Sequence, residues 1–390
     1  MTEALMQSIH NVIDHVIAHR RALHQIPELG LALPETSAYV EKSLWELGLR
    51  PERLAGCGIA VTLGQGEKTL LLRADMDALQ VPEPKTLPFC SRNGNMHACG
   101  HDLHTAILLG TAQVLKQHEA QLPCRVKLAF QPGEEVGTGA ETMIKDGLLE
   151  HPHVDAAAAL HVNPDMEPGT CSYCPGVATS AIYDIYIKVW GKGGHSSKPE
   201  ETVNALAAAN GIYNTLGGLI QREVGGFDTG IFALCSMHAG SQQNPNIIPE
   251  YCEMAGTLRC FDPELGEYLI KRIREIVEGE AAVFHAKGEV ETLLTPSLRV
   301  DPHLAKIMAP SLVEILGEDH VTRADMPFSG SEDFSYIAEK VPSFFCWIGA
   351  GKPGSPMLHN PDVMFDERAL ETGVKIMVNF PFAWAAQMFK

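Results

Sequence analysis

Hydrophobic and polar positions follow two different periods along this chain, and the two periods predict helices and strands in turn. Leu5, Ile9, Ile13 and Val16 recur at helical spacing, so residues 5–24 are expected to form a helix. Apolar runs typical of buried strands occur at residues 69–73, 125–130, 154–161 and 343–349, with helical stretches at 105–116 and 138–149. This alternation predicts an α/β fold with an open, mixed, mostly parallel sheet and helices on both faces.

The middle of the chain has a different pattern. Residues 181–190 alternate between apolar and polar like a half-exposed strand. Helices are expected at about 202–221 and 263–278, and further strands near 231–237, 251–258 and 281–292. This order fits a small α+β module of ferredoxin-like type, with helices on one face of an antiparallel sheet. We therefore predict a main domain of residues 1–178 and 295–390, interrupted by an inserted domain of residues 179–294.

Length and charge narrow the classes of function. The chain has 390 residues, 45% of them hydrophobic, which suits two domains with full-sized cores. Its formal net charge of −18 argues against nucleic acids and anionic membrane surfaces as partners, because both reward Lys and Arg. The start of the chain lacks a basic region followed by an apolar run, and no stretch approaches the roughly 18–20 apolar residues of a membrane span. A cytoplasmic location is therefore expected.

Ten cysteines are scattered along the chain. Without an export signal they are expected to be free thiols and core residues rather than a disulfide framework. Cys171 and Cys174 have the spacing of half a zinc knuckle, but no second pair completes it, so a metal site is not expected there.

The most informative chemistry lies in two short segments, residues 94–104 and 131–135. They offer a thiol, imidazoles and two adjacent carboxylates beside glycines, which is the inventory of a metal-activated water with its own proton acceptor. Two histidines near or beyond the ends of predicted strands join them, because ligands in open α/β sheets gather at the carboxyl ends of strands. The candidates in chain order are Cys99, His101, Glu134, Glu135, His161 and His359.

Each candidate also has a purely structural interpretation. Cys99 could be a small buried hydrophobe, and His101 could sit in the first turn of a helix. The glutamate pair could begin a helix, where carboxylates favour the dipole, and His161 could be a satisfied core histidine. The convergence of four separated segments on one edge of a sheet favours a site. His97 and His104 are expected to support the site or the fold rather than to bind metal.

Several motifs give the chain a resemblance that covers almost its whole length. They are residues 24–30 (HQIPELG), 72–79 (LRADMDAL), 96–102 (MHACGHD), 131–135 (QPGEE), 191–195 (GKGGH), 246–249 (NIIP), 256–259 (GTLR), 331–334 (SEDF) and 358–359 (LH). Because these motifs occur in this order and at this spacing, the chain resembles the family of co-catalytic metallopeptidases. That family contains hippurate hydrolases, N-acyl-amino-acid amidohydrolases and plant auxin-conjugate amidohydrolases.

The resemblance implies a site for two divalent metal ions. Cys99 would bridge both ions as a thiolate. His101 and His161 would complete the shell of one ion, and Glu135 and His359 that of the other. Zinc suits the thiolate and the imidazoles, whereas mixed sites with carboxylates also admit manganese, nickel or cobalt.

The same resemblance assigns roles around the metals. Glu134 would be the general base, since one of two adjacent carboxylates can ligate while the other faces the water. Asp75 and Asp77 would orient the ligands and tune their basicity. Arg73 occupies the position of a metal-binding histidine in wider relatives. Because an Arg cannot bind a metal ion, His101 would provide the imidazole ligand instead.

The inserted domain would carry the residues that meet the substrate. His195 would stabilise the oxyanion, in its own active site or in that of a partner subunit. Asn246 would offer its amide to the same oxygen or to the substrate carboxylate, and Arg259 would bind that carboxylate through its fork of donors. The resemblance further implies that this domain acts as a lid and joins two subunits in a homodimer.

The expected activity is hydrolysis of the amide bond in small N-acyl amino acids. A dipeptidase or carboxypeptidase-like enzyme of the same family stays open, as does a binding protein that has lost catalysis. The binding protein predicts a broken ligand set, which the sequence does not show. A serine hydrolase is not expected, because the sequence has no Gly-x-Ser-x-Gly motif.

Overall fold

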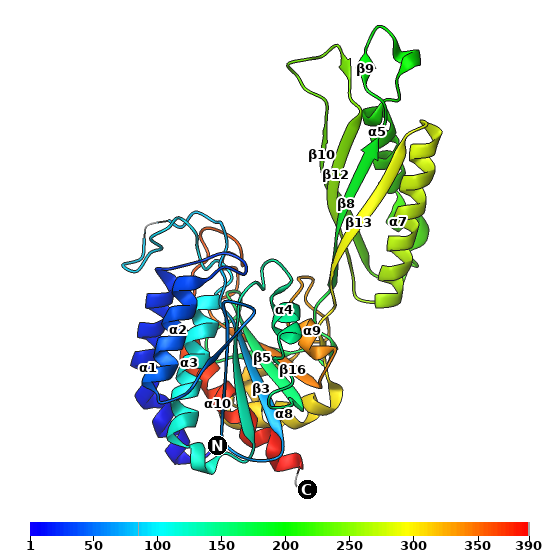
Figure 1. Ribbon diagram of the computed structural model, residues 1–390. Coiled ribbons are helices and arrows are strands. Elements are labelled where there is room, and N and C mark those ends of the chain that lie inside the picture. The colour runs from blue at the N-terminus through cyan, green and yellow to red at the C-terminus, as the bar shows by residue number, and fades with distance from the viewer. Residues whose placement is uncertain (85, 389–390) are drawn as a thin grey trace. The chain divides into compact units, whose positions relative to one another are not determined.

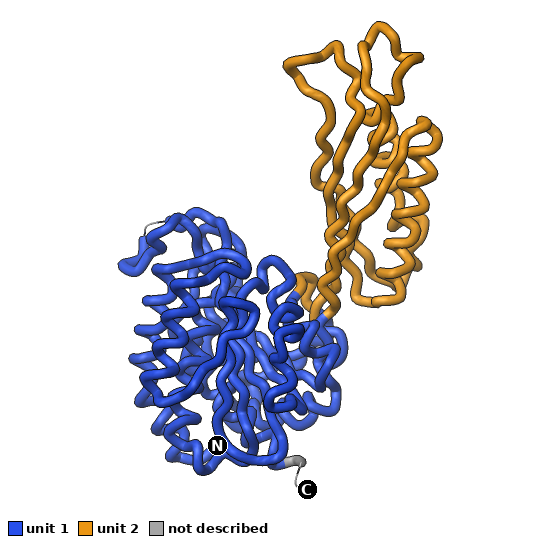
Figure 2. Tube along the Cα trace, viewed as in Figure 1, with its two compact units in different colours: residues 1–178, 298–327, 332–390 blue, residues 179–297, 328–331 orange. Residues whose placement is uncertain are grey.

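A computed structural model describes residues 1–84 and 86–388. The chain forms two compact units, which Figure 2 shows in different colours. Unit 1 comprises Met1–Ala178, Leu298–Pro327 and Glu332–Lys390, and unit 2 comprises Thr179–Ser297 and Phe328–Ser331. Unit 2 therefore interrupts unit 1 in sequence, and the chain enters it a second time at residues 328–331.

Unit 1 is built on a mixed sheet flanked by helices (Figure 1), which confirms the predicted α/β class. Across the sheet the strands are β1 (Glu52–Leu54), β2 (Gly58–Leu63), β4 (Arg125–Gln131), β3 (Thr69–Asp75), β5 (Ala156–Asn163), β16 (Ser343–Gly349), β6 (Cys171–Tyr173) and β15 (Val321–Arg323). The central strands β4, β3, β5 and β16 run parallel, so their carboxyl ends meet at one edge. A separate antiparallel pair consists of β7 (Gly176–Val177) and β14 (Arg299–Val300).

The helices of unit 1 cover this sheet and one another. They are α1 (Glu3–His24), α2 (Pro34–Glu46), α3 (His101–Gln117), α4 (Gly139–Lys145), α8 (Pro302–Leu316), α9 (Ser335–Ala338) and α10 (Arg368–Met388), with short 3-10 turns at Glu119–Gln121 and Glu318–His320. Helix α3 packs on the central strands β3, β4 and β5, and α1 and α10 pack on α3. All seven residues of β3 are buried, as expected for a strand covered on both faces.

Two differences from the sequence-based boundaries bear on the site. The helix expected to begin near Thr105 begins at His101, because Gly100, with a φ of 86°, adopts the left-handed conformation that turns the chain into the helix. His101 is therefore the first residue of α3 rather than a loop residue before it. Strand β5 continues to Asn163, so His161 lies within the strand and not at its end.

Unit 2 has a ferredoxin-like order of elements. Its antiparallel sheet has the strand order β10 (Gly230–Ala239), β12 (Tyr251–Cys260), β8 (Ala181–Trp190) and β13 (Lys287–Thr295). Its helices are α5 (Ala205–Leu216), α6 (Leu219–Glu223) and α7 (Pro263–Val283), with a 3-10 turn at Pro199–Glu201 and a small pair formed by β9 (Gly194–His195) and β11 (Ile247–Ile248). Alternate residues of β8 share one core with α5 and α7, as its sequence pattern predicts.

Three further details of the prediction concern unit 2 and the cysteines. The strand expected from residue 281 begins at Lys287, because the alanines at its predicted start continue helix α7 instead. The helix expected over 202–221 divides into α5 and α6 at Gly217 and Gly218. All ten cysteines are free thiols, as predicted.

Among residues 1–84 and 86–388, no helix combines the length and the apolarity that crossing a membrane requires.

Candidate metal centre

The predicted ligands lie at the carboxyl edge of the parallel strands of unit 1. Asp75 is the last residue of β3, and His161 lies near the end of β5. Cys99 and His101 stand at the start of α3, which packs against these strands. The loops that follow β3, β4 and β16 carry Asp77, Glu134, Glu135 and His359. Because the strands are parallel, these separate segments meet at one place.

Cys99 belongs to two overlapping groups of donor atoms. Its Sγ and one nitrogen each of His101 and His161 all lie within 4.8 Å of one another. The same sulfur forms a second group of that size with a carboxylate oxygen of Glu135 and a nitrogen of His359. Cys99 Sγ approaches His161 Nε2 to 3.4 Å, and His359 Nε2 approaches Glu135 Oε2 to 3.5 Å. The five residues therefore come together with one thiol common to both groups.

Hydrogen bonds orient the two buried imidazoles toward this cluster. Nδ1 of His101 lies 2.9 Å from the carbonyl oxygen of Asp77, and Nδ1 of His161 lies 2.8 Å from the carbonyl oxygen of Val162. A carbonyl oxygen only accepts, so each ring donates its Nδ1–H and directs Nε2 to the cluster. This arrangement, in which an outer hydrogen bond fixes the ring, is the usual one for histidines that bind metal.

Two polar atoms in the cluster have no hydrogen-bond partner among the described residues. They are Nε2 of His101 and Oε1 of Glu135, and both are buried. A buried polar atom without a partner costs about 1–3 kcal/mol. Divalent metal ions would supply the missing partners, and a thiolate, imidazoles and a carboxylate are a suitable donor set for zinc and its neighbours. The residues present therefore fit a metal centre.

Asp77 holds three parts of the cluster in place. Its Oδ1 accepts the backbone N–H of Glu134 at 3.1 Å, and its Oδ2 accepts that of Glu135 at 3.0 Å. Its carbonyl oxygen accepts Nδ1–H of His101. One fully buried residue thus fixes the positions of the predicted base and of two predicted ligands.

The two ambiguous histidines differ in their surroundings. His104 donates from Nδ1 to Asp75 at 2.6 Å and accepts the backbone N–H of Val162 at Nε2 at 2.9 Å. With both nitrogens engaged, His104 supports the site and has no lone pair left for a metal. Neither ring nitrogen of His97 has a partner among the described residues, and burial lowers its pKa to about 3. His97 belongs to none of the donor groups found in that part of the chain.

Two carboxylates of the cluster have pKa values above the usual range for glutamate. Burial, together with the charges of Glu332 and Glu135, raises the pKa of Glu134 well above its usual value. Burial also raises the pKa of Glu135 to about 7, although His101 opposes this shift. Oε1 of Glu134 lies 3.4 Å from the backbone nitrogen of Asp333, and Oε2 lies 3.9 Å from Nε2 of His101. Divalent cations would lower both pKa values and so favour the ionised carboxylates.

A buried ion network that the sequence did not predict lies beside Glu134. The guanidinium of Arg73 donates to Gln131 at 2.9 Å, to Asp75 at 2.7 Å and to Asp333 at 2.7 Å, and it lies 3.0 Å from Glu332. Gln131 donates in turn to both carboxylate oxygens of Asp333. The available signals were a charged residue in an otherwise apolar strand and the 331–334 motif, but neither identifies the partner.

The predicted substrate-side residues all belong to unit 2. His195 ends β9, and its Nδ1 accepts the backbone N–H of Ser197 at 3.1 Å, so in the neutral ring Nε2 carries the proton and can donate it. Asn246 is exposed in the loop before β11. Arg259 lies in β12, with Nη1 3.4 Å from the carbonyl oxygen of Ser329. All three side chains can offer hydrogen-bond donors, and their action on a substrate stays a prediction.

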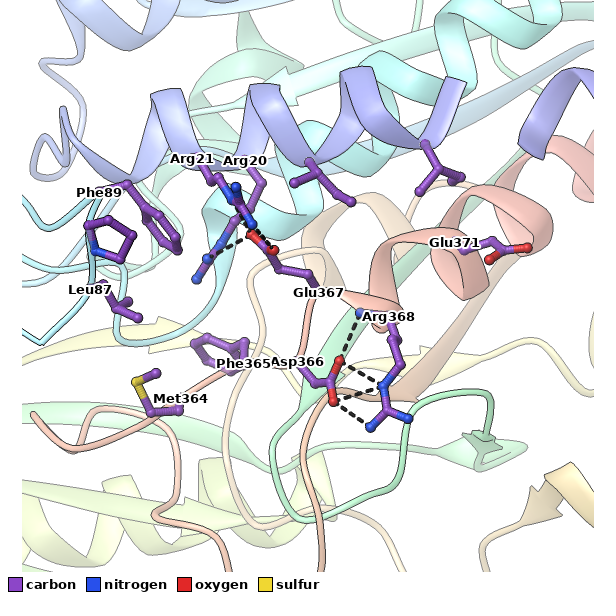
Figure 3. Close-up of a pocket in the computed structure, with 13 residues that line it drawn as sticks. Arg20, Arg21, Leu87, Phe89, Met364, Phe365, Asp366, Glu367, Arg368 and Glu371 are labelled. Carbon is purple, nitrogen blue, oxygen red and sulfur yellow. Dashed lines mark hydrogen bonds and ion pairs between the residues drawn. The ribbon is translucent and has the colours of Figure 1, made fainter. Parts of the chain in front are cut away.

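A separate cavity of about 550 Å³ lies elsewhere in unit 1 (Figure 3). It is lined by residues of α1, by residues 87–89 and 364–368 and by Glu371, and none of the predicted ligands lines it. The charges at its wall are already paired: Arg20 and Arg21 bind Glu367, and Arg368 binds Asp366. Arg20 also donates to Asp102 at 2.9 Å, next to His101, so this wall braces the start of α3.

Comparison with known proteins identifies the class to which this fold and cluster belong. The model of Peptidase family M20/M25/M40 matches residues 71–382, and the chain belongs to this family. It is 33% identical over 361 residues to the N-acetylcysteine deacetylase of Bacillus subtilis (strain 168), covering 91% of this chain and 93% of that protein. It is also 33% identical over 374 residues to the IAA-amino acid hydrolase ILR1-like 4 of Arabidopsis thaliana, covering 93% and 84%.

A solved structure agrees with this assignment. The YXEP protein of Bacillus subtilis, a dinuclear metal-binding peptidase, superposes with a TM-score of 0.79 at 30% identity and covers 95% of this chain and 98% of its own. The predicted membership in the family of amidohydrolases and metallopeptidases is therefore confirmed.

Proposed function

We propose that this protein is a metal-dependent amidohydrolase that cleaves the amide bond of N-acyl amino acids. The observation that carries the proposal is the pair of donor groups that share Cys99, with the carboxylate of Glu134 beside them. The curated relatives support the substrate class, since both are named for hydrolysis of an acyl group joined to an amino acid.

Five residues would hold two divalent metal ions, with His101 and His161 on one side of Cys99 and Glu135 and His359 on the other. Bound there, the ions would lower the pKa of water and polarise the amide carbonyl. The support is the grouping of the donor atoms and the two orphaned buried atoms, Nε2 of His101 and Oε1 of Glu135. Zinc, manganese, nickel and cobalt all remain compatible with this donor set.

The chain's own residues would bind the substrate and move the protons. Glu134 takes a proton from the attacking water and returns it to the leaving amine. Asp77 fixes the backbone of Glu134, so the carboxylate keeps its orientation while the proton passes. In unit 2, His195 donates Nε2–H to the developing oxyanion, with Asn246 as a further donor. Arg259 pairs with the free carboxylate of the amino acid.

A panel of substrates tests this proposal. We expect metal-reconstituted protein to hydrolyse N-acetyl, N-benzoyl or indoleacetyl amino acids, and a chelator to abolish the activity until metal is restored. Amino-acid release would be followed with ninhydrin or mass spectrometry. Turnover of free dipeptides alone would transfer the assignment to a dipeptidase. No turnover of any substrate by protein with two bound metals would instead indicate a binding protein.

The proposal includes a homodimer formed through unit 2. Strand β10 pairs with β12 on one side and has no partner strand on the other among the described residues. Its neighbourhood exposes apolar side chains, including Phe227 and Ile231. An open strand edge with exposed apolar residues is a template for pairing with a second copy. Sedimentation equilibrium should give a dimer at micromolar concentration, and Ile231→Lys should weaken it; a monomer in both proteins would contradict this arrangement.

A further inference from the structure

Three exposed apolar side chains lie on two loops that adjoin the carboxylates of the metal centre in sequence or through a β-bridge. Leu29, Leu31 and Val136 are 38%, 40% and 48% exposed, and we call them the apolar rim. Val136 follows Glu135 in the chain, and residue 29 forms a β-bridge with Ala78, the neighbour of Asp77. Single exposed apolar residues are common on proteins, but a group of them beside a catalytic cluster marks a surface that binds something apolar.

The two loops that carry the rim are packed against each other. The side chain of Leu31 covers Gly133 so closely that a Cβ at Gly133 would lie 2.6 Å from its Cδ2. A Cβ at Gly30 would lie 3.7 Å from Cγ1 of Val136. The loops after β4 and before α2 thus touch through their glycines, and this contact fixes the rim next to Glu134.

Hydrogen bonds from backbone and side-chain groups hold both loops in place. The amide of Ala78 donates to the carbonyl of Glu28 at 2.8 Å, and the carboxylate of Glu28 accepts the N–H of Thr36 at 2.8 Å in the first turn of α2. On the other loop, Gly137 donates to the carbonyl of Glu134 at 2.8 Å. The rim is therefore formed before any ligand binds, which reduces the entropy lost on binding.

The charges around the rim decide which part of a substrate fits it. Neither loop, residues 28–33 nor residues 131–140, contains a Lys or an Arg; the second loop includes Glu134 and Glu135, whose backbone N–H groups donate to Asp77. The two loops therefore offer no cationic partner to the carboxylate of an amino acid, whereas an uncharged acyl chain or ring would gain by leaving water. Arg259, the candidate partner for the carboxylate, belongs to unit 2.

We infer that the apolar rim binds the acyl group of the substrate and favours aliphatic or aromatic acyl groups larger than acetyl. This inference rests on the proposed function, because it assigns a specificity determinant for the same reaction. Each rim residue acts by covering the acyl group next to the reacting carbonyl. Removing an apolar contact of this kind lowers selectivity by about tenfold, the lower end of what one methylene is worth in an apolar pocket.

The test replaces apolar surface by polar surface of similar shape. The variant Leu29→Gln/Val136→Thr leaves Leu31 and its contact with Gly133 in place. We expect the ratio of kcat/KM for N-benzoylglycine over N-acetylglycine to fall about tenfold, mainly through KM. The matched control Val313→Thr changes an exposed valine of α8 and should leave the ratio unchanged. An unchanged ratio in the rim variant would overturn the inference.

Two further arms keep the inference separate from the proposed function. In the first, the amino acid is varied at a constant acetyl group; if the rim variant alters the preference between N-acetylglycine and N-acetylleucine instead, the rim binds the amino-acid side chain and the inference fails. In the second, calorimetry measures binding of N-benzoylglycine to metal-loaded Glu134→Gln protein, with and without the rim substitutions. A dissociation constant that rises about tenfold supports the rim even if no substrate is turned over, and an unchanged constant overturns it.

Discussion

The variant Glu134→Gln is expected to lose activity by about 10³-fold while it keeps its fold and its metal ions. The amide has nearly the same shape as the carboxylate but cannot take a proton from water, and a positioned general base contributes about 10²–10⁴-fold. The loss should appear in kcat more than in KM, because the missing interaction acts mainly in the transition state. Steady-state kinetics on the best N-acyl substrate, beside metal analysis of the same preparation, measures it.

The matched control is Glu150→Gln, which removes an exposed carboxylate of unit 1 that lies in none of the donor groups. Its kcat should remain within about twofold of the unmodified protein, as expected for a surface change. Retention of more than a tenth of the activity by Glu134→Gln would show that another group takes the proton. Loss of bound metal from this variant would show that Glu134 is a ligand.

The variant Arg73→Met is expected to destabilise the protein by about 3–5 kcal/mol, the usual cost of removing one partner from a buried ion network. Three carboxylates, those of Asp75, Glu332 and Asp333, lose their only guanidinium partner in the described network. Unlike an exposed pair, they cannot turn to water, because all three are buried. Urea denaturation in the presence of a chelator measures the loss without a contribution from bound metal.

Two comparisons make this prediction specific. Arg21→Met removes a half-exposed guanidinium that pairs with Glu367, and should cost only about 0–1 kcal/mol. Adding Asp333→Asn to Arg73→Met removes one of the unpaired charges and should restore part of the stability. If Arg73→Met lowered the free energy of unfolding by less than about 1 kcal/mol, the buried network would not stabilise this part of unit 1 as described.

The fold could be predicted best where one physical signal decided the outcome. The strands over 343–349 and 181–190 have the predicted bounds, because a continuous apolar run and a strict alternation each define where a strand is buried. The start of α3 could not be placed, since it depends on the left-handed conformation of Gly100 and not on a capping side chain. The alanines at 281–282 were misassigned because apolar residues alone do not distinguish the end of a helix from a strand.

For the candidate site, the sequence predicted which residues could bind metal, but not the surrounding contacts that hold those residues in position. The predicted ligands Cys99, His101, His161, Glu135 and His359 are of residue types that commonly bind metals. Parallel strands bring the loops at their carboxyl ends together. The contacts of Arg73 with Glu332 and Asp333 join residues about 260 positions apart, so a local sequence pattern cannot predict them. The apolar rim could not be predicted either, because it forms only when the loop before α2 packs against the loop after β4.

The proposed function depends on two metal ions held by Cys99, His101, Glu135, His161 and His359. Anomalous diffraction from crystals grown with zinc or manganese tests it directly. We predict two peaks per chain on either side of Cys99 Sγ, one beside His101 and His161 and the other beside Glu135 and His359. A single peak, or ions bound instead by Glu332 and Asp333, would contradict the proposed centre and with it the assignment of Glu134 as the base.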